Sequence, residues 1–144
     1  MKITFFINND YLDIDINKKY HLIGWGLRSL VYIESINEVI YAIENTKKTS
    51  EIWEMGYNST YINIKKTRVR IADATDYINL DKHLEATEDN DIKCKKVSGK
   101  FTGYIDIELN LFKKILLEWK SFVKHTDSMT YSQKKSYRKD IELS

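Results

Sequence analysis

The sequence predicts an α+β fold, in which an antiparallel sheet built from a hairpin and a meander is covered by two amphipathic helices. The segments 2–16 and 51–72 alternate apolar with polar residues, which is the period-two pattern of half-buried strands. The segments 36–48 and 109–124 place their apolar residues on a single helical face instead. Elements that each carry one apolar face are stabilised by packing against each other, so we expect the two helices to cover the sheet.

Length and composition predict one domain. The chain has 144 residues, of which 42% are hydrophobic, and this is enough to bury a core and fold alone. Apolar residues become sparse near the end, so we assign 1–125 to a single α+β domain and 126–144 to a polar, frayed or loosely helical tail. There is no secretory pattern and no run of about 18 apolar residues, so we expect a soluble, cytoplasmic protein and no membrane partner.

The N-terminal hairpin is predicted from two strand-like segments, 2–7 and 11–16. They flank Asn8-Asn9-Asp10, residue types that tolerate positive φ in tight turns. In the second segment, apolar residues alternate with Tyr and Asp. This alternation predicts a strand with one buried and one solvated face.

A helix is predicted next, over 36–48. The preceding segment 22–34, LIGWGLRSLVYIE, stays undecided between strand and helix because its two glycines weaken a helix while its end suits either. Ser35 and Glu38 have the spacing of a capping box, in which the two side chains satisfy free amide groups at a helix start. Two lysines then lie where cations complement the helix C-terminus.

The meander is predicted from three short strands at 51–55, 61–64 and 69–71, joined by polar turns. Gly56, after the first of them, suits an unusual backbone angle. The polar residues between the strands are typical of solvated hairpin ends. We therefore interpret the stretch 54–76 as scaffold and not as a binding site.

The rest of the chain is predicted to contain a polar loop and the longest helix. Residues 79–91 are polar and acidic, 92–97 are weakly strand-like, and a further strand ends near 106–108. The helix over 109–124 then has a wide apolar face, formed by Leu111, Ile115, Leu116, Trp119, Phe122 and Val123.

The residues that most often carry catalysis form no recognisable constellation. His21, His83 and His125 are far apart in the sequence, and none has a metal-ligand spacing. Cys94 has lysine neighbours that would lower its thiol pKa, but no histidine base is near it in the sequence. With one cysteine there is also no internal disulfide. We expect no enzyme, no metal and no cofactor.

Charge is unevenly distributed although the chain is nearly neutral, at +2. Residues 1–90 carry 11 Lys/Arg against 14 Asp/Glu, whereas residues 91–144 carry 12 against 7. Asp13 and Asp15 share one face of the second strand, with Asp10 in the turn before it. Such carboxylates can bind a divalent cation, but they more often form the solvated face of an edge strand, and we favour the second interpretation.

A nucleic-acid-binding surface is the alternative function. Four cations in the meander, beside Tyr57 and Tyr61, could place positive charge and stacking rings on one sheet surface. These cations are Lys65, Lys66, Arg68 and Arg70. Acidic residues nearby in the sequence and the small net charge make nucleic acid the less favoured partner.

Two runs of the sequence resemble a known family. WEMGYNSTYINIKKTRVRI at 53–71 and GYIDIELNLFKKILLEWKSFV at 103–123 are similar to the small immunity proteins of bacterial contact-dependent growth inhibition and related polymorphic toxin systems. The resemblance includes a Gly-Asn-Ser segment before a strand pair, here Gly56 to Ser59, and a Leu-Glu-Trp near the end of a late helix, here Leu117 to Trp119. It covers residues 33–124.

The resemblance implies a function without catalysis. Such proteins bind one cognate toxin domain, often a nuclease, and block it in the cytoplasm as a one-to-one complex. A nuclease with a basic cleft would be contacted by exposed carboxylates. The expected toxin-binding residues are therefore Asp10, Asp13, Asp15, Glu85, Glu88 and Asp89. The slightly basic net charge departs from the acidic character frequent among nuclease inhibitors, so either the acidic N-terminal part provides the contacts or the toxin is not a basic nuclease.

Overall fold

The computed structural model describes residues 1–73, 95–97 and 100–143. The elements, in chain order, are β1 (Lys2–Asn8), β2 (Tyr11–Ile16), the 3₁₀ turn η1 (Lys18–Tyr20), α1 (His21–Ser29), α2 (Ile33–Thr49), β3 (Trp53–Tyr57), β4 (Thr60–Lys65), β5 (Arg68–Asp73), β6 (Lys95–Val97), β7 (Lys100–Thr102), β8 (Tyr104–Ile107), α4 (Leu109–Asp127), α5 (Tyr131–Lys134) and β9 (Arg138–Glu142). The fold is α+β, with helices and antiparallel sheets, as the sequence predicts.

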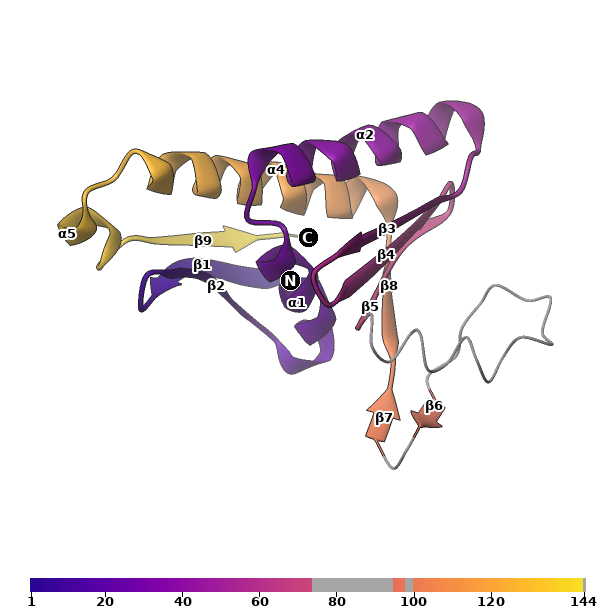
Figure 1. The fold of residues 1–144 in the computed structure, drawn as a ribbon, viewed down its shortest axis with the longest axis horizontal. Coiled ribbons are helices and arrows are strands. Elements are labelled where there is room, and N and C mark those ends of the chain that lie inside the picture. Colours follow the sequence, from indigo (N-terminus) through magenta and orange to yellow (C-terminus); the bar gives the residue numbers. More distant parts are fainter. Residues whose placement is uncertain (74–94, 98–99, 144) are drawn as a thin grey trace.

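The strands form two main sheets, where the sequence analysis expected one. The terminal sheet has the order β2-β1-β9, and the meander sheet has the order β3-β4-β5-β8; β6 and β7 form a separate pair. The hairpin and the meander therefore do not join, because β9 pairs with β1 and α1 packs against both β2 and the meander strands β4 and β5. Figure 1 shows α1 between the two sheets, with α2 and α4 side by side above them.

The predicted hairpin and meander are confirmed. Asn9 and Asp10 have φ of 48° and 70°, the two positive angles of a tight hairpin turn, and Asn8 pairs with Tyr11 across it. The meander strands pair in sequence order, and β8 extends that sheet beside β5.

The segment that the sequence left undecided is the helix α1. Gly26 permits this helix to lie close to β5, because a Cβ at this position would be 3.1 Å from Cγ2 of Ile71. Its close neighbours Ile23 and Leu27 are fully buried. The glycine that weakens the helix locally thus allows its packing on the sheet.

Helix α2 confirms the predicted helix but begins earlier, at Ile33. The expected capping box is wrong: Ser35 lies inside the helix, and the N-cap is Tyr32, which makes no side-chain capping bond. The extra turn is stabilised by packing, because Ile33 lies against the core. The helix ends at Ser50, whose φ is 62°.

Helix α4 confirms the other predicted helix and carries the largest buried side chains. Its N-cap Glu108 accepts hydrogen bonds from the amides of Asn110 and Leu111. On its apolar face, the rings of Trp119 and Phe122 lie 5.0 and 5.5 Å from the ring of Phe5 on β1. These contacts seal the inner face of the terminal sheet.

The assignment of 126–144 to a frayed tail is wrong. Helix α4 continues to Asp127, and β9 pairs with β1 from Lys2 to Phe6. The amide of Leu143 also donates to the carbonyl of Met1, at 2.7 Å, and Leu143 is buried. The segment is ordered because it completes a sheet whose inner face is apolar. The boundary at residue 125 therefore does not separate the core from a tail.

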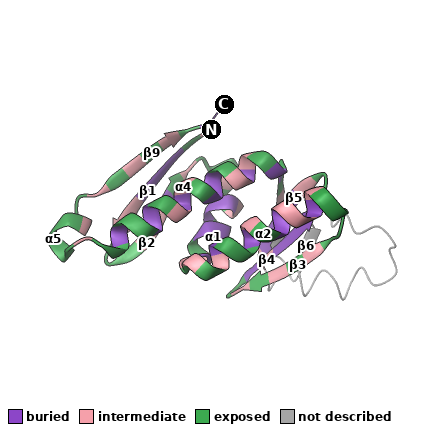
Figure 2. Ribbon diagram, turned by 90° about the horizontal axis from the view of Figure 1, so that it is seen from above, coloured by how far each residue is buried: buried purple, intermediate pink, exposed green. Residues whose placement is uncertain are grey.

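The buried apolar residues described by the structure form a single cluster. It includes residues from both main sheets and from α1, α2 and α4. Figure 2 shows these buried positions along the facing sides of the helices and strands. One core thus holds the two sheets together.

Candidate functional site

The terminal sheet has one buried and one exposed face. Residues such as Ile3 and Phe5 point to the core, so their neighbours along β1 point the other way. We call the second side the outer face of the terminal sheet. Its residues are Lys2, Thr4 and Phe6 on β1, Asp13 and Asp15 on β2, and Arg138, Asp140 and Glu142 on β9.

Strand register places polar groups in rows across this face. Asp15 and Asp140 flank Thr4, one on each neighbouring strand, and two strand spacings put their Cα atoms about 10 Å apart. The Thr4 hydroxyl donates a hydrogen bond of 2.6 Å to Oδ1 of Asp140. In the next row, the guanidinium of Arg138 lies 5.7 Å from the centre of the Phe6 ring.

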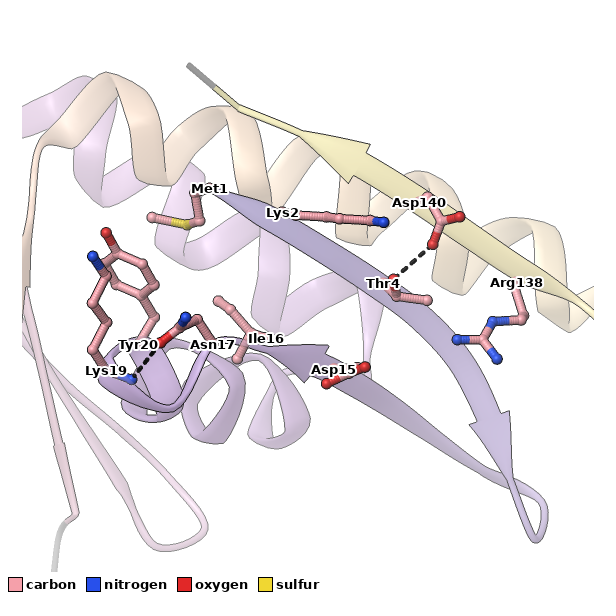
Figure 3. Close-up of a pocket in the computed structure, with 10 residues that line it drawn as sticks. All are labelled: Met1, Lys2, Thr4, Asp15, Ile16, Asn17, Lys19, Tyr20, Arg138 and Asp140. Atoms are coloured by element: carbon pink, nitrogen blue, oxygen red, sulfur yellow. Dashed lines mark hydrogen bonds between the residues drawn. The ribbon is translucent and has the colours of Figure 1, made fainter.

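A hollow of about 670 Å³ opens over the Thr4 row. Figure 3 shows Asp15, Thr4 and Asp140 along it, with Lys19 and Tyr20 from the turn after β2 closing one side. Its remaining lining residues are Met1, Lys2, Ile16, Asn17 and Arg138. The lining is mostly polar and carries both signs of charge, which suits polar side chains of a partner better than an apolar ligand.

The carboxylates of this face differ in how they are held. Nε of Arg28 lies 2.6 Å from Oδ1 of Asp13, and the Ile14 amide and Asn8 also donate to this carboxylate. Burial alone would raise the pKa of Asp13, but these bonds outweigh it and lower the pKa. By contrast, Asp15 makes no hydrogen bond or ion pair with any residue that the structure describes, so its charge faces solvent.

The structure places two of the predicted acidic residues, Asp13 and Asp15, on the outer face of the terminal sheet and adds two that the sequence analysis missed. Asp10 is exposed in the hairpin turn, with Asp13 and Asp15 following on β2. Asp140 and Glu142 join them because β9 pairs with β1. A strand that carries these two residues could have been predicted from RKDIEL, residues 138–143, because charged and apolar residues partly alternate there. The other predicted residues, Glu85, Glu88 and Asp89, lie outside the described residues.

The cations of the alternative site do not form an exposed strip. Arg70 is 4% exposed, and its Nε and Nη2 lie 2.7 and 2.8 Å from the two carboxylate oxygens of Asp106. Its guanidinium also lies 3.9 Å from the centre of the Tyr104 ring. Arg68 donates to the backbone and side-chain oxygens of Asn63. The guanidinium groups of both arginines therefore make hydrogen bonds within the meander sheet.

The remaining parts of that alternative lie partly together and partly on the other face of the meander sheet. Lys65 and Lys66 lie at the turn between β4 and β5, the latter exposed. Tyr57 belongs to the opposite face, where its hydroxyl donates to Glu38 on α2 at 2.7 Å. Burial, reinforced by Glu38, raises the pKa of Tyr57. Tyr57 therefore provides no ring beside the cations, whereas Tyr61 lies on their face of the sheet, where its hydroxyl accepts a hydrogen bond from Asn63.

The residues considered for metal and thiol chemistry do not gather either. Within the described ranges, no three His, Cys, Asp or Glu residues are placed to hold a metal ion. His21 is exposed beside the η1 turn, and the ring of His125 lies 5.1 Å from that of Tyr137. His83 and Cys94 lie outside the described residues. Among the described helices, none has the length and apolar character needed to cross a bilayer.

The fold and this face define a small α+β chain with two main antiparallel sheets, one of which presents a hollowed, polar face with both signs of charge to solvent. Comparison with protein-family models, with curated proteins and with solved structures gives no match.

Proposed function

We propose that this chain is a cytoplasmic immunity protein that binds one toxin domain, one to one, and neutralises it without catalysis. The observation that carries the proposal is the outer face of the terminal sheet. Four carboxylates and two cations lie there beside a polar hollow that Lys19 also lines, and Arg28 pairs with one of the carboxylates. The carboxylates belong to Asp13, Asp15, Asp140 and Glu142, and the cations to Lys2 and Arg138.

A protein partner suits this face because the face is broad and rigidly supported. Three paired strands hold it, and buried rings under β1 pack it against α4. A preorganised surface loses little conformational freedom on binding. The carboxylate of Asp15, which is exposed and has no described partner, and the neighbouring Asp140 favour basic groups on the partner, such as those of a nuclease cleft, because complementary charge accelerates encounter and selects the partner.

The resemblance of residues 33–124 to immunity proteins supports the choice of a toxin as that partner. Protection against a few toxin molecules requires slow dissociation, and hence an affinity in about the nanomolar range. Nucleic acid is the less favoured partner, because Arg68 and Arg70 are held inside the meander sheet. A basic nuclease cleft and the acidic face would instead attract each other directly.

Co-expression tests the proposal. An immunity gene is expected directly downstream of a large secreted toxin gene, so the C-terminal domain of that toxin is expressed with this chain. Cells should survive, and a one-to-one complex should co-purify. Cell death with no complex, together with a shift of RNA or DNA by this chain at physiological salt, would contradict the proposal.

Paired charge variants test the face itself. The double variant Asp15→Asn/Asp140→Asn removes two carboxylates while keeping an acceptor for Thr4, and should weaken the complex about tenfold or more, mainly through slower association. The matched control is Glu34→Gln/Asp127→Asn, which makes the same charge change at exposed positions on α2 and α4. Equal affinities for both variants would place the interface elsewhere.

A further inference from the structure

Strand β3 forms one rim of the meander sheet. It pairs with β4 on one side and has no strand partner on the other among the described residues. Figure 2 shows β3 at the outer edge, beside α2, with the terminal sheet at the other end of the molecule. An open strand edge presents unpaired backbone groups and is a template for pairing with another strand.

The hairpin geometry defines which residues direct their backbone to this open edge. Tyr57 pairs with Thr60 across the two-residue turn at 58–59. The pair that closes such a turn is hydrogen-bonded, and bonded and non-bonded pairs alternate along the ladder. Trp53, Met55 and Tyr57 therefore bond to β4, whereas Glu54 and Gly56 point their N–H and C=O groups outward.

The sequence of β3 is complementary to itself when reversed about Met55. Two antiparallel copies with Met55 on the two-fold axis place Glu54 opposite Gly56 of the second copy, and Trp53 opposite Tyr57. Glu54 of each copy then exchanges backbone hydrogen bonds with Gly56 of the other copy, as an antiparallel ladder requires. A two-fold axis through Glu54 would place the two Glu54 carboxylates opposite each other, which is unfavourable. An axis through Gly56 would leave fewer residues of the two strands paired.

The two rings that would meet across the axis are already held in place. Trp53 donates from Nε1 to Oδ1 of Asn45 at 3.1 Å, and Tyr57 is fixed by its bond to Glu38. Beside them, Tyr41 is 63% exposed and stands perpendicular to the Trp53 ring, at 5.9 Å. Rings that are fixed before association lose little entropy on binding.

We infer that β3 pairs with β3 of a second copy of this chain, which joins two meander sheets into one continuous sheet. Ile52, which is 55% exposed next to the strand, lies where this contact would shield it. The contact leaves the outer face of the terminal sheet at the far end of each copy. The inference therefore does not depend on the proposed function.

Sedimentation and one proline variant test the pairing. The mass of the full chain should rise from one toward two copies between about 10 µM and 1 mM. Glu54→Pro removes an outward N–H while leaving the bonds to β4 intact, so it should weaken association about tenfold or more. Glu54→Ala, which keeps the N–H, is the control and should still associate. A chain that stays monomeric to 1 mM would overturn the inference, and so would unchanged association of a folded Glu54→Pro.

A cross-link decides the matter if the proline variant does not fold. Facing residues in a non-hydrogen-bonded antiparallel pair have Cα atoms about 4.5 Å apart, within disulfide reach. Met55→Cys should therefore form a covalent dimer on mild oxidation, in a Cys94→Ser background. Tyr11→Cys, exposed in the other hairpin, should not. Equal cross-linking of the two variants would also overturn the pairing.

Discussion

At the scale of single residues, Trp119 connects three parts of the molecule. Its ring is fully buried on α4 and meets Phe5 of the terminal sheet edge-on. Its Nε1 donates a buried hydrogen bond of 2.7 Å to the carbonyl of Leu30, directly after α1. The side chain thus combines a large apolar contact with the partner that a buried carbonyl needs.

Two substitutions separate these roles of Trp119. Trp119→Ala should lower the free energy of unfolding by about 3–5 kcal/mol, because it leaves a cavity. Trp119→Phe keeps most of the ring but leaves the Leu30 carbonyl without its partner, and should cost about 1–3 kcal/mol. Urea titration followed by far-UV circular dichroism measures both. A loss under about 1 kcal/mol for the alanine variant would show that α4 is not docked through this ring.

The Asp13–Arg28 pair predicts a pH dependence of stability. The pKa of Asp13 is lowered from its ordinary value of 3.8, so the native state binds its proton less readily than the unfolded chain does. The stabilisation is therefore present above about pH 4 and is lost as the pH falls through the lowered pKa. Because the Arg28 side chain is 45% exposed, water screens the pair, and we expect about 0.5–1 kcal/mol.

The comparison of Arg28→Gln with the unchanged chain measures this effect. Their unfolding free energies should differ more at pH 6 than at pH 2, because Asp13 becomes increasingly protonated as the pH falls through its lowered pKa. The remaining difference at pH 2 reports the bond from Arg28 to the Ile14 carbonyl, which does not titrate. A difference that stays constant over this range would show that the ion pair adds nothing to stability.

At the scale of elements, β9 replaces a predicted polar tail by a strand of the terminal sheet. It pairs with β1 over five residues and directs Ile141 and Leu143 toward the core. It also places Asp140 and Glu142 on the outer face of the terminal sheet. One strand therefore completes both the core and the candidate binding face.

Deletion of 138–144 should consequently destabilise the fold. The loss of two apolar side chains and of one edge of β1 is expected to cost about 3–5 kcal/mol, or a melting temperature lower by about 10–20 °C. Leu143→Asp should act in the same direction, whereas the outward-facing change Glu142→Lys should leave the melting temperature nearly unchanged. Thermal melts compare the three; an unaltered melting temperature after the deletion would restore the reading of this segment as a tail.

At the scale of the whole molecule, one core unites two sheets that the chain builds separately. Helix α1 packs between them, and α2 and α4 lie side by side across them (Figure 1). The acidic outer face and the β3 rim are at opposite ends of this arrangement (Figure 2). Two interactions can therefore occur on one chain without competing for the same surface.

A shared core predicts a single unfolding transition. Of the three tryptophans, Trp119 lies at the contact between α4 and the terminal sheet, Trp53 on β3 of the meander sheet and Trp25 on α1, whereas circular dichroism reports all helices and strands. Tryptophan fluorescence and far-UV circular dichroism should give the same urea midpoint, since a small domain with one core unfolds cooperatively. Two distinct midpoints would mean that the sheets unfold independently.

Helices and strands whose hydrophobic pattern lies within one continuous segment can be predicted from the sequence alone. The hairpin, the meander and the helices α2 and α4 follow from periods of two and of 3.6 residues, because each such element must bury one continuous face. The predicted acidic residues Asp13 and Asp15 share a face for the same reason. These features need no knowledge of a distant partner.

The contacts between segments that are distant in the chain are seen in the tertiary structure and could not be predicted from local sequence patterns. Thr4 and Asp140 are 136 residues apart in the chain, and their hydrogen bond depends on the pairing of β1 with β9. In the same way, the sequence suggests Arg70 as a nucleic-acid-binding cation, whereas in the structure it pairs with Asp106 on β8. Helix α1, weak by local propensity, is stable because it packs between two sheets. The free energy of such contacts comes from burial and pairing across the fold, and no local pattern of residues reports it.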